Sequence, residues 1–130
     1  MLILNKSTSP KKGVSLDNEI KDITNKNNNK VICKALNQRP VFLNRYLEAS
    51  NNRKDKTRRK RLFQVAIELI KRATEDDITS KQKEQFGIGY SLKGLLLNGM
   101  ILNVHIREES DNKDKRLFLI STFLDKIKKA

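Results

Sequence analysis

Polar and apolar residues follow the period of a β-sheet in the last third of the chain. Two apolar runs, 95–97 and 100–102, flank the dipeptide Asn98-Gly99. Asn-Gly tolerates the positive φ angles at both central positions of a type I′ turn. The pattern therefore predicts a β-hairpin closed by a two-residue turn.

The strand that follows this turn has two different faces. Its residues alternate between polar and apolar in the order Asn103, Val104, His105, Ile106 and Arg107. Successive side chains of a strand point to opposite faces of the sheet. A polar loop at 109–115 leads into an apolar run at 116–123. We expect a three-stranded antiparallel meander with one apolar face and one polar face that carries His105 beside Arg107.

The apolar spacing before the meander is that of helices. The clearest stripe runs through residues 59–74, and shorter helices are predicted from Pro40 to about residue 49 and over 81–86. The run 31–36 is short and apolar, fits a strand or a helix, and could supply a fourth strand. The expected fold class is α+β, with N-terminal helices packed on a C-terminal antiparallel meander of three to four strands.

Composition changes the picture at the N-terminus. Residues 1–30 are rich in Asn, Lys, Ser and Thr, a mixture that buries little apolar surface. The whole chain has 130 residues, which is enough for one modest core. We therefore expect a flexible basic arm at 1–30 and a single α+β domain at 31–130.

Charge indicates the class of partner. The chain carries 28 Lys and Arg against 15 Asp and Glu, a net charge of +13, which attracts nucleic acids and also anionic membrane surfaces. The candidate nucleic-acid-binding residues form one dense run and one smaller group: Arg53, Lys54, Lys56, Arg58, Arg59, Lys60 and Arg61, and then Lys113, Lys115 and Arg116. The alternative for the dense run is a solvated loop or, in a eukaryotic host, a localisation signal.

Several classes of protein and site are not expected. No run approaches the roughly 18 apolar residues of a membrane span, and the chain does not begin with a secretory signal pattern. One cysteine, Cys33, and one histidine are too few for a zinc site within the chain. We expect a cytoplasmic protein with no cofactor and no metal.

The polar strand face offers the chemistry of metal-independent RNA cleavage. That reaction needs a base for the 2′-hydroxyl proton, an acid for the leaving oxygen, and cations around the phosphorus. Histidine exchanges protons near neutral pH, so His105 is the candidate base or acid, while Arg107 can hold a phosphate bidentately. Ser121 and Thr122 end the last apolar run and could lie near them. The simpler alternative is a surface histidine among basic neighbours.

The chain also resembles a known superfamily. The segment LFQVAIELIKRATEDDI, followed by LNGMILNVHIREE and KRLFLISTF, is similar to the barnase–EndoU–colicin–RelE-like small ribonuclease toxins, especially their phage-associated branches, over roughly residues 60–123. This resemblance implies helices on one face of a four-stranded antiparallel sheet and RNA cleavage without a metal. By position it implies catalytic roles for His105, Arg107, Ser121 and Thr122. RNA is then the expected partner, together with an acidic antitoxin or inhibitor protein.

Two other functions fit the same sequence. In a winged-helix DNA-binding protein, residues 91–97 would form a recognition helix and 100–123 the wing. In a non-catalytic RNA-binding component of a larger ribonucleoprotein particle, such as a ribosome, the polar N-terminal segment would be an RNA-binding arm. The conformation of residues 91–97, strand or helix, separates the winged helix from the ribonuclease.

Overall fold

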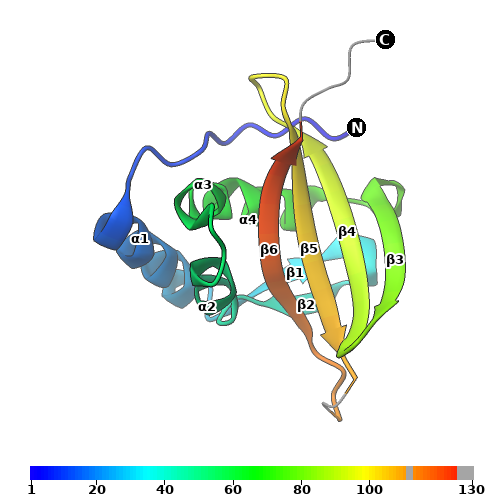
Figure 1. Cartoon of the computed structure of the whole chain (residues 1–130). Coiled ribbons are helices and arrows are strands. Elements are labelled where there is room, and N and C mark those ends of the chain that lie inside the picture. Colours follow the sequence, from blue (N-terminus) through cyan, green and yellow to red (C-terminus); the bar gives the residue numbers. More distant parts are fainter. Residues whose placement is uncertain (111–112, 126–130) are drawn as a thin grey trace.

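The computed structural model describes residues 1–110 and 113–125 and has an α+β fold (Figure 1). In the described residues the α-helices are Gly13–Lys26 (α1), Tyr46–Asn51 (α2), Lys56–Lys60 (α3) and Phe63–Arg72 (α4). Two short 3₁₀ helices are Lys34–Leu36 (η1) and Glu75–Asp77 (η2). The strands are Lys30–Cys33 (β1), Arg39–Phe42 (β2), Ile78–Glu84 (β3), Gly87–Leu95 (β4), Ile101–Glu109 (β5) and Leu117–Asp125 (β6).

The six strands form one mixed sheet in the order β1-β2-β6-β5-β4-β3. The antiparallel meander predicted from the sequence is present as β4, β5 and β6, and β3 extends it. The predicted number of strands, three to four, was too small, because β1 and β2 form a further hairpin. β2 runs parallel to β6 and pairs with it only through Val41 and Phe42.

The extra hairpin replaces a helix that we expected after Pro40. Pro40 lies in β2 opposite Ile32 of β1, next to the first residue of the strand, where a missing N–H is tolerated. Val31 and Val41 face each other and are buried. The expected helix is reduced to α2, because burying this valine pair in the sheet outweighs the helical spacing of the segment.

The second expected helix, over 81–86, is strand β3 instead. This segment is almost wholly polar, so its hydrophobic pattern carries little information about its structure. It becomes a strand because its backbone pairs with β4 from Ile78 to Glu84. Residues 91–95 likewise belong to β4, so the recognition helix of a winged-helix protein is absent from the place where that hypothesis requires it.

The long helix expected over 59–74 is divided into α3 and α4. α4 buries most of its length, including Phe63 and Leu69, against one face of the sheet, and Figure 1 shows it behind the strands. Gly94 of β4 permits this close approach, since an added Cβ would lie 3.0 Å from side-chain atoms of Leu69 and Leu4. α3 contacts β6 instead, so the chain bends between the two helices.

The N-terminal segment differs from the expected flexible arm. Leu4, Leu16 and Ile20 are buried in the core. Leu4 donates its backbone N–H to the carbonyl of Leu95 at 2.8 Å, and Glu68 of α4 accepts the backbone N–H groups of residues 5 and 6. A few well-placed apolar side chains therefore attach a segment whose overall composition is polar.

No helix of the described residues is long and apolar enough to cross a bilayer.

Candidate active site on the open face of the sheet

The two faces of the meander differ as the alternation predicted. Val104 and Ile106 of β5 are fully buried on the side of α4. His105 and Arg107 point to the opposite face, which no helix of the described chain crosses in Figure 1. We call this the open face. Its polar centre, contributed by four neighbouring strands, consists of Glu84 of β3, Ser91 of β4, His105 and Arg107 of β5, and Ser121 of β6.

The centre of the open face is a polar contact between Glu84 and His105. Nε2 of His105 lies 2.9 Å from Oε1 of Glu84, with 25% and 29% of the two side chains exposed. The carboxylate crosses β4 at Gly89, where an added Cβ would lie 1.7 Å from Oε1 and 2.7 Å from Cε1 of His105. A residue without a side chain is therefore needed at this position for Glu84 to reach His105.

This contact selects the protonation pattern of the ring. A carboxylate accepts hydrogen bonds, so Nε2 of His105 carries the proton that it shares with Glu84. In the neutral ring, Nδ1 is then the atom with a free lone pair. The pair combines a proton acceptor with a carboxylate that orients the ring.

Two arginines are held beside this pair by one buried carboxylate. Glu109, whose side chain is 8% exposed, forms an ion pair with Arg45 and lies 3.9 Å from NH2 of Arg107. The guanidinium carbon of Arg45 also lies 3.9 Å from the centre of the Phe118 ring. Nε of Arg107 is buried and has no hydrogen-bond partner. The carboxylate therefore lies close to both guanidinium groups, and Arg45 is also held against the Phe118 ring.

A cavity of about 340 Å³ separates α2 from the open face at these arginines. Its lining includes both guanidinium-bearing residues, two polar residues of the α2 region and one apolar residue of β6: Arg45, Arg107, Glu48, Asn52 and Ile120. The cavity therefore offers an anion two positive side chains, one of them on Arg107, two residues along β5 from His105.

Ser121 and Thr122, which we expected together near His105, lie on opposite faces of β6. Ser121 pairs in register with His105, and only 6% of it is exposed. Thr122 is fully buried on the core side, because adjacent residues of a strand alternate. Its Oγ1 lies 2.6 Å from the hydroxyl of Tyr46 and donates to the carbonyl of Arg59 at 2.9 Å.

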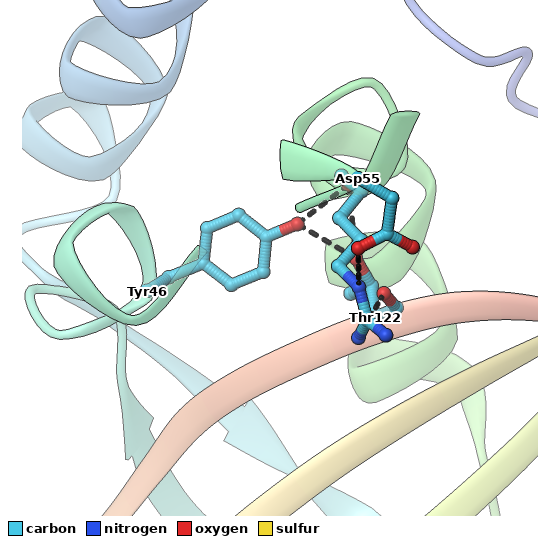
Figure 2. Close-up of polar contacts among 4 residues, drawn as sticks. Tyr46, Asp55 and Thr122 are labelled. Atoms are coloured by element: carbon cyan, nitrogen blue, oxygen red, sulfur yellow. Dashed lines mark hydrogen bonds and ion pairs between the residues drawn. The ribbon is translucent and has the colours of Figure 1, made fainter. Parts of the chain in front are cut away.

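Figure 2 shows the side chains of Tyr46 and Thr122 directed toward each other. Burial raises the pKa of Tyr46 to about 12, so its hydroxyl stays protonated and donates a hydrogen bond. The contact with Thr122 joins α2 to β6 inside the protein. Thr122 therefore holds the fold together and does not reach the open face.

The dense basic run at 53–61 contains both exposed side chains and side chains paired within the fold. Its exposed members are Arg53, Lys54, Lys56 and Arg58. Lys60 is buried and pairs with Asp17 at 2.7 Å, and Nε of Arg59 donates to Asp55 at 2.7 Å. The hydrogen bond from Arg59 lowers the pKa of Asp55. Nε of Arg61 donates to the carbonyl of Lys11 at 3.3 Å. The paired members serve the fold, and the exposed members remain candidates for phosphate contact.

The second basic group borders the other end of β6. Lys113, Lys115 and Arg116 are exposed in the loop before that strand. Arg116 lies 3.5 Å from Asp114, and the carbonyl of Lys115 accepts a 2.5 Å hydrogen bond from Arg39. Arg59 on α3 contacts the carbonyl of Thr122, nearer the other end of β6, so the two basic groups lie toward different ends of that strand.

Sequence reasoning missed Glu84 and Arg45. Glu84 was placed on an expected helix, although the pair of glycines at 87 and 89 marked a place where the backbone makes close approaches. Arg45 precedes α2 and reaches the open face only because that helix packs along β6. No local sequence pattern predicts such a contact.

No group of three or more His, Cys, Asp or Glu side chains that could hold a metal ion occurs in residues 1–110 and 113–125. Comparison with protein-family models, with curated proteins and with solved structures finds no match for this chain.

Proposed function

We propose that this protein binds RNA and cleaves it without a metal, using His105, paired with Glu84, as its general base and acid. The observation that carries the proposal is the 2.9 Å contact between these side chains, made on an open sheet face beside Arg107. The chain also has a net charge of +13, which favours a polyphosphate substrate.

The reaction is attack of a ribose 2′-oxygen on the neighbouring phosphorus. Nδ1 of His105 takes the 2′-hydroxyl proton, and Glu84 stabilises the positive ring that results. The ring then returns the proton to the 5′-oxygen as the phosphorus–oxygen bond breaks. The products are a 2′,3′-cyclic phosphate and a free 5′-hydroxyl, and the pair ends in its starting state.

Arg107 and Arg45 supply the positive charge that the transition state requires. Negative charge grows on the phosphoryl oxygens as the fifth bond forms, and fixed cations stabilise it most when they need not reorganise. Glu109 pairs with Arg45 and lies 3.9 Å from NH2 of Arg107, so one carboxylate favours a fixed position for both guanidinium groups. The side chain of Arg107 is 23% exposed, so its terminal nitrogens can donate to a phosphoryl oxygen.

The test is cleavage of end-labelled total tRNA and of a generic single-stranded RNA in EDTA. Wild type should give discrete products with cyclic phosphate ends, whereas His105→Ala and Glu84→Gln should lose cleavage by about 10² to 10⁴-fold. Glu75→Gln, an exposed carboxylate on η2, is the matched control and should cleave normally. Salt-sensitive binding without products would instead favour a non-catalytic RNA-binding component.

A further inference from the structure

Two exposed phenylalanines lie on the open face, on either side of His105. Phe86 is 52% exposed and Phe123 is 38% exposed. We infer that their rings stack against unpaired bases, so that the substrate is single-stranded RNA with a base on each side of the phosphate at His105. This inference rests on the proposed function and adds the conformation of the RNA that the site accepts.

Strand register places the two rings. Phe123 of β6 pairs with Asn103, two residues before His105 on β5. Phe86 occupies the β3–β4 turn, and its ring centre lies 5.8 Å from the guanidinium carbon of Arg107, two residues after His105. A two-residue step along a strand is about 7 Å, so one ring lies roughly one step from His105 on each side.

Each ring has an arginine beside it. The guanidinium carbon of Arg59 lies 5.7 Å from the centre of the Phe123 ring. Arg59 is fixed by its hydrogen bonds to Asp55 at 2.7 Å and to the carbonyl of Thr122 at 3.3 Å. At Phe86, the backbone carbonyl accepts the N–H of Ser110 at 3.0 Å, which ties the turn to β5.

This combination matches the way proteins bind single strands. An aromatic ring offers its face to any base, and a neighbouring arginine attracts both the base and the backbone phosphate. Bases of a duplex are already stacked on one another and cannot reach such rings. The two exposed phenylalanine side chains also lose solvent contact when bases cover them.

The test measures binding separately from cleavage. Fluorescence anisotropy is recorded with a 2′-O-methyl single-stranded RNA, which has no 2′-hydroxyl to react, and with a hairpin of the same composition. Phe86→Ala and Phe123→Ala should each weaken binding of the single strand by about tenfold, and Phe86→Tyr and Phe123→Tyr should restore it. Binding of the hairpin should be weaker in wild type and should not change in the variants.

Ile32→Ala is the matched control, because Ile32 is 46% exposed on β1 at the far edge of the sheet. It should bind like wild type. Unchanged single-strand binding in both alanine variants, or equal wild-type binding to strand and hairpin, would overturn the inference. If cleavage in EDTA persists while the phenylalanine variants bind normally, only the stacking inference fails. If wild type binds the strand through both rings but cleaves no RNA, only the proposed chemistry fails.

Discussion

Oε1 of Glu84 lies 2.9 Å from Nε2 of His105, although the two residues belong to strands that are not neighbours. Strand β4 runs between them, and the contact passes over Gly89. The contact between Glu84 and His105 thus depends on the sheet order, on the register of two strand pairs and on the absence of a side chain at Gly89. Each of these dependencies can be tested.

Gly89→Ala should disable the site while leaving the fold intact. Its new Cβ would lie 1.7 Å from Oε1 of Glu84, and the flexible end of that side chain would move away from His105. We expect RNA cleavage to fall by at least tenfold with little change in the thermal unfolding temperature. Gly94→Ala is the contrasting variant: it crowds Leu4 and Leu69 in the core and should cost about 1–3 kcal/mol of stability. Equal cleavage by Gly89→Ala and wild type would show that cleavage does not depend on the contact between Glu84 and His105.

Glu109→Gln should weaken phosphate binding more than the adjacent substitution Glu108→Gln. Glu109 pairs with Arg45 and lies 3.9 Å from Arg107 on the open face, whereas Glu108 pairs with Arg39 at 2.6 Å. We expect a higher KM for RNA and a loss of about 1–3 kcal/mol of stability for Glu109→Gln. Steady-state kinetics and urea unfolding measure the two effects. Equal KM values for the two variants would contradict the arrangement.

Ser121→Ala and Thr122→Val should have opposite consequences. Ser121 pairs with His105 on the open face, so its loss should reduce cleavage with little effect on stability. Thr122 is buried and bonded to Tyr46, so loss of its hydroxyl should cost about 1–3 kcal/mol. Cleavage by Thr122→Val at a temperature where it is folded should match wild type. A loss of cleavage in folded Thr122→Val would indicate that Thr122 contributes to catalysis.

Tyr46 should make stability depend on alkaline pH. Burial raises its pKa from 10.0 to about 12, so the unfolded chain loses this proton at lower pH than the folded protein. The stability linked to the neutral hydroxyl is complete below pH 10 and is lost as the pH rises through about 12, a decrease on the order of 2–3 kcal/mol. Urea unfolding from pH 9 to 12 measures it. Tyr46→Phe, with no proton to lose, should show a smaller decrease over that range; equal slopes would exclude Tyr46 as the cause.

Substitutions of Arg58 and Lys60 should affect different properties, RNA binding for Arg58 and stability for Lys60. Arg58 is exposed on α3, whereas Lys60 is buried against Asp17 at 2.7 Å. Arg58→Ala should weaken RNA binding and reduce the slope of log affinity against log salt by about one unit or slightly less. Lys60→Ala should lower the unfolding temperature and leave the salt slope of the folded protein unchanged. The reverse assignment would mean that the paired lysine contacts RNA.

The sequence by itself determined the properties that depend on residue order and composition. The alternation from Asn103 to Arg107 established which side chains of β5 share a face, and Asn98-Gly99 marked the hairpin. The α+β class and the positive charge followed in the same way. These features are local or additive, so they can be derived without knowing which segments meet.

Only the tertiary structure decided which residues face each other. The turn between β4 and β5 differs from the expected two-residue turn. Gly99 has a φ of 85°, but Asn98 is not among the described residues with positive φ. The connection is a three-residue loop, closed by a hydrogen bond from the N–H of Leu96 to the carbonyl of Met100. A two-residue turn would have set His105 opposite Leu92. The observed loop shifts the register by one residue and sets His105 opposite Ser91, which keeps the apolar sides of both strands together.

The partner of His105 was decided by tertiary structure for the same reason. Residues 78–84 are too polar to show a strand period, and they become β3 because β4 offers them backbone partners. That pairing brings Glu84 to the open face, while packing of α2 along β6 brings Arg45 to Glu109. The alternation of side chains along one strand can be read from the sequence. The pairing of distant strands depends on burial and hydrogen bonding between segments that lie far apart in the sequence.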